Sequence, residues 1–137
     1  VHGRIRCSTI QVTHFIPNCL LTVKLGDPGL STDYTVHDVP WIAIEDYGDL
    51  SASRKNLKGD IWAYATTLWE IFSRGAQLNL PNPVQFFTSG DRPPKPADCA
   101  MLPGIYDLML KGWDVDPEKR FSPQKIFSRL LEASKIT

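Results

Sequence analysis

The feature that most constrains the fold is an apolar run at residues 60–75, D-I-W-A-Y-A-T-T-L-W-E-I-F-S-R-G. Large apolar residues recur in it at the spacing of one helix face, namely Ile61, Ala65, Leu68 and Phe72. The tryptophans between them widen that face, which is typical of a helix buried in a core. Gly75 is expected to end the helix, because glycine adopts the left-handed conformation without strain. Asp60, at its start, either favours the helix N-terminus through its charge or orients a neighbouring loop.

Composition and charge restrict the classes of protein compatible with this chain. Its 137 residues, 42% of them hydrophobic, suffice for one domain with a core and are not typical of a disordered chain. The formal net charge is zero, so no general attraction to nucleic acid or to an anionic membrane surface is expected. Cys7, Cys19 and Cys99 have no C-x-x-C spacing, which favours reduced thiols over a disulfide framework or a zinc site. The absence of a long apolar run predicts no membrane insertion.

The pattern along the chain predicts two strands before the central helix and mainly helices after it. The first strand is expected to end near Val12, and the second to span residues 20–25 after a turn at Pro17 and Asn18. Further helices are expected at residues 83–89, at residues 102–113 and from Ser122 and Pro123 onwards. The predicted fold class is therefore α+β, with a short β-hairpin beside a mainly helical body.

Several motifs, in order along the whole chain, resemble the C-terminal lobe of a protein kinase. V-H-G-R-I-R-C-S-T at residues 1–9 corresponds to V-H-R-D-L-x-x-x-N, and K-L-G-D-P-G at residues 24–29 corresponds to K-x-x-D-F-G. P-W-I-A-I-E at residues 40–45 corresponds to W-x-A-P-E, and D-I-W at residues 60–62 to the kinase D-V-W. T-L-W-E-I, R-P-P-K-P-A-D-C and G-W-D-V-D-P-E-K-R are similar to tyrosine-kinase sequences. Each motif is weak alone, but their common order is a strong signal.

Two departures from the usual motifs narrow the family. H-G in place of H-R, and D-P-G followed by a short loop to P-W, are similar to the pseudokinase domain of the Janus kinases. In that family this domain precedes a tyrosine kinase domain on the same chain. The resemblance implies that residues 1–137 are a partial kinase-like domain, the C-terminal lobe from catalytic loop to final helix, with the N-terminal lobe outside the chain.

The residues at the catalytic positions differ from those that phosphoryl transfer needs. That reaction uses a carboxylate that accepts the substrate hydroxyl proton, and metal ions that neutralise the phosphates. Arg4 stands where the carboxylate belongs, and a guanidinium has no acceptor atom and stays protonated. Thr9 stands where an Asn would hold a second Mg²⁺, and a hydroxyl is a poorer ligand than an amide carbonyl. The resemblance thus implies that no catalytic residue is intact.

Asp27 is retained at the remaining metal position. The resemblance implies that the complete domain binds ATP with Mg²⁺ through this carboxylate. D-P-G is also a good turn sequence by itself, so a turn role for Asp27 stays open. The glycine-rich loop and the lysine that clamp a nucleotide in kinases have no counterpart in this sequence.

Residues that hold the kinase frame together are kept. The resemblance implies an ion pair between Glu45 and Arg120, and losing one partner of a buried pair costs about 3–5 kcal/mol. Asp60 matches the Asp that accepts backbone hydrogen bonds from the catalytic loop. His2 is expected to pack there and to bond to the backbone rather than to act as a base. A domain that loses its catalytic base but keeps the contacts that hold its fold together is expected to act through its shape rather than through catalysis.

Three residues near these positions have a functional alternative. Cys7 is expected to be a structural thiol, because no His and Asn support a nucleophile. Tyr34 lies in the loop after D-P-G and is a candidate phosphorylation site. Asp38 is a candidate substitute base, although nothing in the sequence fixes its distance from a nucleotide.

The function that the resemblance implies is regulatory. The segment would belong to a Janus-type non-receptor tyrosine kinase and restrain a tandem tyrosine kinase domain of the same chain. Through the whole protein its partners would be a cytokine receptor and STAT proteins, in the cytoplasm at a receptor-bearing membrane. One alternative is a divergent but active kinase that transfers phosphate from ATP to protein tyrosine. Another is a receptor-type pseudokinase that acts as an allosteric docking module.

Overall fold

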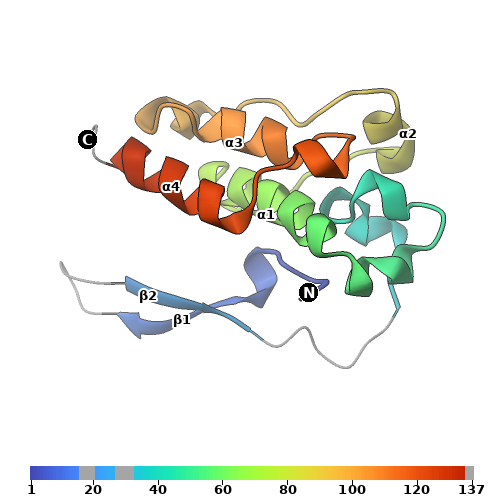
Figure 1. Cartoon of the computed structure of the whole chain (residues 1–137), viewed down its shortest axis with the longest axis horizontal. Coiled ribbons are helices and arrows are strands. Elements are labelled where there is room, and N and C mark those ends of the chain that lie inside the picture. The colour runs from blue at the N-terminus through green and yellow to red at the C-terminus, as the bar shows by residue number, and fades with distance from the viewer. Residues whose placement is uncertain (16–20, 27–32, 135–137) are drawn as a thin grey trace.

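The computed structural model describes residues 1–15, 21–26 and 33–134, which form a β-hairpin beside a helical body (Figure 1). The strands are β1 (Ile10–Phe15) and β2 (Leu21–Leu25), and the α-helices are α1 (Leu57–Phe72), α2 (Pro83–Thr88), α3 (Ile105–Gly112) and α4 (Pro123–Ser134). Short 3₁₀ helices join them, at residues 7–9, 36–41, 44–46, 50–55, 97–101 and 117–119. The predicted α+β class, with a short hairpin and a mainly helical body, is confirmed.

The hairpin is a two-stranded antiparallel sheet that lies on the side of α1 away from α3 (Figure 1). Ile10 pairs with Leu25 and Val12 with Val23, and the register shifts just after Val12. Both predicted strands are present, although the first continues past its predicted end near Val12 to Phe15. The turn predicted between them lies outside the described residues.

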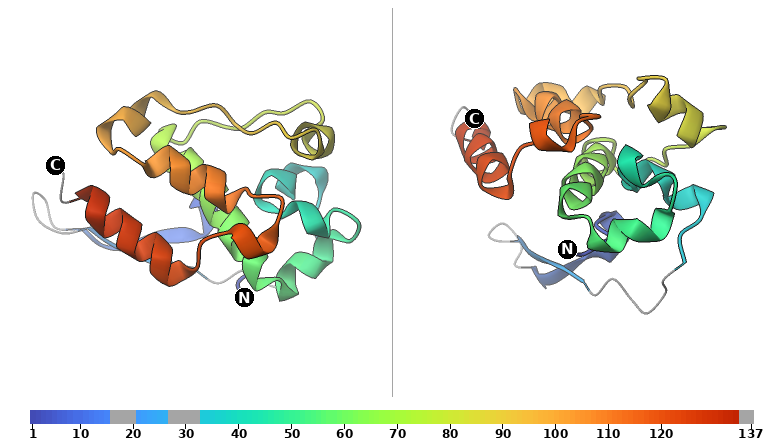
Figure 2. Two further views of the ribbon diagram at one scale, coloured as in Figure 1. Left: turned by 45° about the horizontal axis from the view of Figure 1, so that its top comes forward. Right: turned by 45° about the vertical axis from the view of Figure 1, so that its right-hand side comes forward.

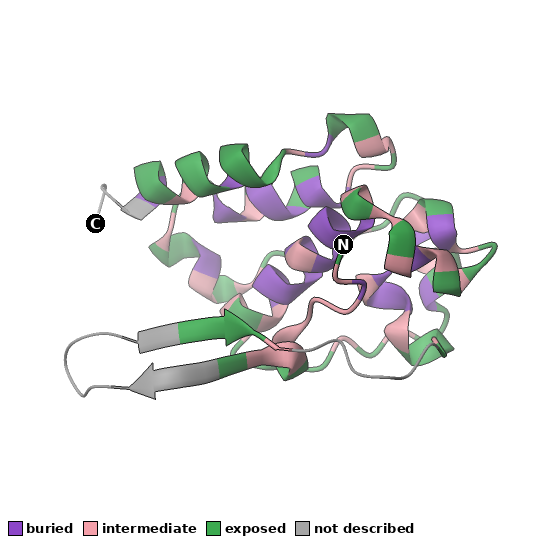
Figure 3. Cartoon of the chain, turned by 60° about the horizontal axis from the view of Figure 1, so that its bottom comes forward, coloured by how far each residue is buried: buried purple, intermediate pink, exposed green. Residues whose placement is uncertain are grey.

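Helix α1 lies at the centre of the body, with α3 and α4 on one side and the N-terminal loop on the other (Figure 2). Buried residues concentrate where these elements meet (Figure 3). The core cluster includes Trp62, Leu68 and Trp69 from α1, packed with Phe87 from α2 and with residues of α3 and its C-terminal end. Each large apolar side chain that is fully buried stabilises the fold by about 1.5–3 kcal/mol. The predicted buried central helix is confirmed.

The ends of α1 differ from the prediction. The helix begins at Leu57, before Asp60, because Asn56 is already its N-cap residue. It ends at Phe72, and Gly75 then adopts the left-handed conformation (φ 77°), with its N–H donating to the Glu70 carbonyl at 2.8 Å. Arg74, however, already adopts the left-handed conformation (φ 57°) and its N–H donates to the Ile71 carbonyl at 3.1 Å, so the chain leaves the helix one residue before Gly75.

A buried polar chain fixes the segment before the helix. The Trp113 Nε1–H donates to the Thr66 hydroxyl at 2.9 Å, and that hydroxyl donates to the Pro40 carbonyl at 2.6 Å. The Trp62 indole donates to the same carbonyl at 3.2 Å. Since buried polar groups are costly unless paired, these hydrogen bonds hold residue 40 against α1. Residues 36–41 are thereby placed beside the N-terminal loop.

Candidate functional site

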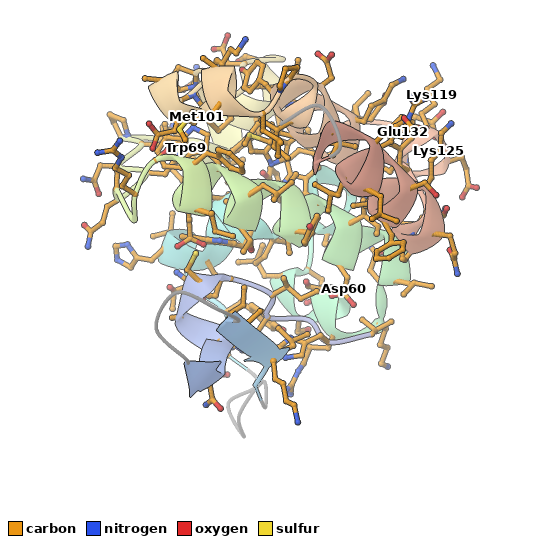
Figure 4. All side chains as sticks on the ribbon, turned by 90° about the vertical axis from the view of Figure 1, so that its left-hand side faces the viewer. Asp60, Trp69, Met101, Lys119, Lys125 and Glu132 are labelled. Atoms are coloured by element: carbon orange, nitrogen blue, oxygen red, sulfur yellow. The ribbon has the colours of Figure 1, made fainter. Side chains whose placement is uncertain are left out.

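The site is built around the N-terminal loop, which α1 holds in place through Asp60. The two carboxylate oxygens of Asp60 accept the backbone N–H groups of His2, at 2.7 Å, and of Gly3, at 2.9 Å. The Asp60 side chain lies at the end of α1 that faces this loop (Figure 4). Of the two roles left open by the sequence, orienting a loop is therefore the one that the structure displays. Charge-assisted bonds of this kind are stronger than neutral ones.

His2 links the loop to the end of β2. Its Nδ1 accepts the Arg4 backbone N–H at 3.1 Å, and its Nε2 lies 2.7 Å from the Gly26 carbonyl oxygen. These partners require a neutral ring with its hydrogen on Nε2, which donates to the carbonyl. Both ring nitrogens are therefore used in backbone bonding, as the sequence led us to expect.

Arg4, at the position of the catalytic carboxylate, has its guanidinium engaged by the segment that follows β2. The guanidinium carbon lies 4.1 Å from the centre of the Tyr34 ring. One terminal nitrogen lies 4.0 Å from an Asp38 carboxylate oxygen, and the other donates to the Asp33 carbonyl. The side chain is 15% exposed. A proton acceptor is thus absent at this position, and a cation fastens two parts of the chain there.

Arg6 and Asp38 form the second contact between the same segments. An Arg6 terminal nitrogen donates to Asp38 at 2.9 Å, and its guanidinium carbon lies 3.7 Å from the Trp41 ring centre. The other Asp38 oxygen accepts the Thr35 backbone N–H at 2.8 Å. Asp38 is thereby occupied as a cap and an ion-pair partner, and these contacts give no support to its role as a substitute base.

Thr9 and Asp27 stand at the two positions that hold metal ions in kinases, and only Thr9 lies within the described residues. The Thr9 hydroxyl lies within 2.8 Å of the Arg4 carbonyl and accepts the Arg6 backbone N–H at 3.2 Å, so it bonds within its own loop. Asp27 lies outside the described residues. Among the residues that the structure describes, no group of three or more His, Cys, Asp and Glu side chains could hold a metal ion.

The Glu45–Arg120 ion pair implied by the kinase resemblance is present. Two Arg120 nitrogens each donate to one Glu45 oxygen at 2.7 Å. The Arg120 side chain is 0% exposed and that of Glu45 is 27% exposed. Burial would by itself raise the pKa of Glu45, but hydrogen bonds from Arg120 and Asn56 outweigh it and hold the pKa below its ordinary value. The pair ties residues 44–46 to the segment before α4.

The sequence analysis missed Glu70, which joins α1 to both parts of the site. One Glu70 oxygen accepts the Cys7 backbone N–H at 3.0 Å and the Trp41 indole N–H at 2.9 Å. Burial, with the nearby Glu70 charge, raises the pKa of the Cys7 thiol to about 11, so the thiol is protonated at neutral pH. This agrees with a structural role for Cys7. No spacing in the sequence could have linked residues so far apart.

Comparisons with known proteins agree with this geometry. The family model described as protein tyrosine and serine/threonine kinase matches residues 1–130. Tyrosine-protein kinase hopscotch of Drosophila melanogaster is 35% identical over 95% of this chain and 12% of its own length. Tyrosine-protein kinase receptor TYRO3 of Rattus norvegicus is 31% identical over 75% of this chain and 13% of its own length. The chain thus spans about an eighth of the length of these relatives.

The match to hopscotch, a Janus kinase, agrees with the family that the motifs indicated. Within the described ranges, none of the helices is long and apolar enough to cross a membrane. The order of the motifs, the Asp60 contacts with the loop and the Glu45–Arg120 pair all fit the matched family model. The chain therefore belongs to the protein tyrosine and serine/threonine kinase family.

Proposed function

We propose that residues 1–137 are the C-terminal lobe of a regulatory pseudokinase domain in a Janus-type non-receptor tyrosine kinase. In this role the domain restrains a tandem catalytic domain of the same chain. The observation that carries the proposal is the guanidinium of Arg4, which stands at the position of the base and is engaged by Tyr34 and Asp38. A permanent cation in this place neither accepts the hydroxyl proton nor orients the hydroxyl for attack.

Members of this family use ATP and Mg²⁺ in general. In our proposal Asp27 holds the one metal ion that remains, and the ion neutralises charge on the nucleotide phosphates. The Thr9 hydroxyl fits a second metal poorly, because it is bonded to the backbone of its own loop. The chain's residues are thus compatible with nucleotide binding but not with proton removal at position 4.

The frame around the lost base supports a regulatory role. Asp60 holds the loop and Glu45 holds Arg120 through bonds of 2.7 Å, so these two parts of the lobe are held in place. A lobe held in this way suits a domain that acts by docking against another one. Its partners in this proposal are the tandem kinase domain and, through the whole protein, a cytokine receptor and STAT proteins in the cytoplasm.

Phosphotransfer by the purified complete domain tests the loss of catalysis. We expect no transfer to a tyrosine peptide above background. In cells, the double variant Arg4→Asp and Thr9→Asn should leave phosphorylation limited by the tandem kinase domain. Robust transfer by the wild-type domain that disappears in Asp27→Ala would contradict the proposal.

The restraint is tested separately in the complete protein. Arg120→Ala removes the buried half of the ion pair and should loosen this lobe, so basal activity of the tandem kinase domain should rise. Arg74→Ala is the matched control, because Arg74 also pairs with a carboxylate, Asp98, but its side chain is 81% exposed. Unchanged or lower basal activity in Arg120→Ala would count against restraint by this segment.

The similarity to TYRO3 keeps the receptor-type alternative open to a direct test. An intact H-R-D and D-F-G set downstream of this segment on the same chain favours the Janus-type assignment. A transmembrane run upstream would favour a receptor-type pseudokinase that acts as a docking module.

A further inference from the structure

Tyr34 reaches back over the catalytic loop and bonds to it. Its hydroxyl donates to the Gly3 carbonyl oxygen at 2.9 Å, across thirty-one positions of sequence. Its ring lies against the Arg4 guanidinium at 4.1 Å from the ring centre. Burial raises the pKa of Tyr34, so the hydroxyl keeps its proton and remains a donor. One side chain thus holds two consecutive residues of the loop.

Gly3 allows this approach because it has no side chain. A Cβ built on Gly3 would lie 3.1 Å from the Tyr34 hydroxyl oxygen and 3.2 Å from the Arg54 Cα, which is tighter than nearly all such contacts. The φ angle of Gly3 is +83°, a conformation that other residues rarely adopt. Arginine, which the kinase motif has at this position, would therefore be strained at this φ angle and would require Tyr34 or Arg54 to shift.

Both residues that depart from the H-R-D motif thus contact Tyr34, which the Arg54 side chain also contacts. Gly3 supplies the space and the carbonyl acceptor, and Arg4 supplies a flat cation beneath the ring. Arg4 and Arg6 both approach Asp38, in the same segment as Tyr34, at 4.0 and 2.9 Å. Gly3 and Arg4 therefore both help to hold residues 33–38, in addition to the loss of the base at position 4.

We propose that Gly3, Arg4 and Tyr34 form a latch that holds residues 33–38 closed over the catalytic loop. The latch places the chain's own phenol beside position 4, where an enzyme of this family receives the hydroxyl of its substrate. Arg4 is a positioning residue in this arrangement. The proposal deepens the function proposed above, and it rests on that function only in taking position 4 as the site of the lost base.

Hydrogen exchange of the complete protein, followed by mass spectrometry, tests the latch. Tyr34→Phe keeps the ring but removes the hydroxyl, and Arg4→Ala removes the cation. Each should speed exchange in peptides covering residues 1–9 and 33–41 about fivefold, the factor that corresponds to one hydrogen bond of typical strength. The Thr35 amide, which donates to Asp38, is the most informative position.

The double variant Arg4→Ala and Tyr34→Phe separates a latch from two unrelated contacts. In a latch the two contacts depend on each other, because Arg4 lies against the Tyr34 ring, so loss of either one already releases the other and the double variant should exchange about as fast as the faster single variant. Independent contacts would multiply to about twenty-five-fold, and that result would overturn the proposal. Unchanged exchange in both single variants would overturn it as well.

Arg129→Ala is the matched control, since Arg129 pairs with Glu132 within α4 and its side chain is 53% exposed. It should leave both peptides unchanged, and an equal increase there would show general loosening and refute the latch. The outcome is independent of phosphotransfer. Phosphotransfer by the wild-type domain would refute the pseudokinase assignment but not the latch. Unchanged hydrogen exchange in the variants would refute the latch but not the pseudokinase assignment.

Discussion

Removal of the Glu45 carboxylate has the largest effect on stability that we predict from this structure. Glu45→Ala leaves the Arg120 guanidinium, whose side chain is 0% exposed, with the carbonyls of Asp114 and Lys58, the Trp62 ring and the nearby Asp46 charge as partners but without its ion-pair bonds. Stranding one member of a buried ion pair costs about 3–5 kcal/mol. Because the Glu45 side chain is itself 27% exposed, water can partly reach the vacated place. We therefore expect a loss near the lower end, about 3 kcal/mol of unfolding free energy.

Urea denaturation followed by tryptophan fluorescence measures this loss, since Trp62 and Trp113 are fully buried. With a typical urea slope of about 1–3 kcal/mol per molar, the midpoint should fall by about 1–3 M. The control is Asp98→Asn, which weakens a pair of similar geometry, with bonds of 2.8 and 3.2 Å, to the exposed Arg74. Exposed pairs contribute little, so its midpoint should barely move. A Glu45→Ala midpoint no lower than that of the control would refute the reasoning.

The same pair gives the stability a dependence on pH whose sign follows from the lowered pKa of Glu45. A carboxylate whose pKa is lower in the folded state stabilises the fold above its unfolded pKa, about 4.3. That contribution is lost as the pH falls through the folded value. Wild-type stability should therefore decline below about pH 4.3 more steeply than that of Glu45→Gln, which has no charge to lose. Parallel acid profiles of the two proteins would contradict this assignment.

Two further substitutions probe the packing and the loop, and a labelling experiment probes the thiol. Gly112→Ala should cost about 1–3 kcal/mol in urea denaturation, because its Cβ would lie 2.6 Å from that of Ala65, whereas Gly48→Ala, with open space around it, should not. Asp60→Asn should cost about 1–3 kcal/mol and speed exchange of the two loop amides it binds, and unchanged exchange would argue against its positioning role. The Cys7 thiol, with its pKa raised to about 11, should react with iodoacetamide at pH 8 far more slowly than a free cysteine, and equal rates would exclude the burial described here.

Local periodicity was enough to predict the central helix but not its surroundings. The spacing of apolar residues in α1 matches its buried face, and Ile61, Ala65 and Leu68 are all buried. The same logic fails at the edges of the body. Ile71 is 51% exposed in the last turn of α1, and Phe127, a large apolar residue of α4, is 65% exposed. Hydrophobicity indicates which residues favour burial, whereas burial also requires a neighbouring element on that side.

Some long-range contacts could be predicted because both residues belong to family motifs, and others could not. Arg120 and Glu45 are 75 positions apart, yet their pairing could be predicted because both belong to kinase motifs. The contact between Glu70 and Trp41 could not be predicted, since the motifs that contain these two residues do not indicate that they pair. The contact between Tyr34 and Gly3 depends on a missing side chain, which no spacing or propensity indicates. The structure was needed to bring these residues together.

The charges at the site explain why restoring the acid at position 4 would not by itself restore a kinase loop. Arg4 and Arg6 share one carboxylate, Asp38, and they also contact the faces of two aromatic rings, Tyr34 and Trp41, while Arg4 donates to the Asp33 carbonyl as well. Each such ring contact is worth about 0.5–2 kcal/mol, depending on desolvation. Arg4→Asp would remove one ring contact and place a second carboxylate near Asp38, where like charges oppose each other. The Arg6–Asp38 pair and the Tyr34 bond to Gly3 would still attach the segment to the loop, so Tyr34 and Asp38 would remain beside the new carboxylate, and position 4 would gain an acceptor without the surroundings that a base requires.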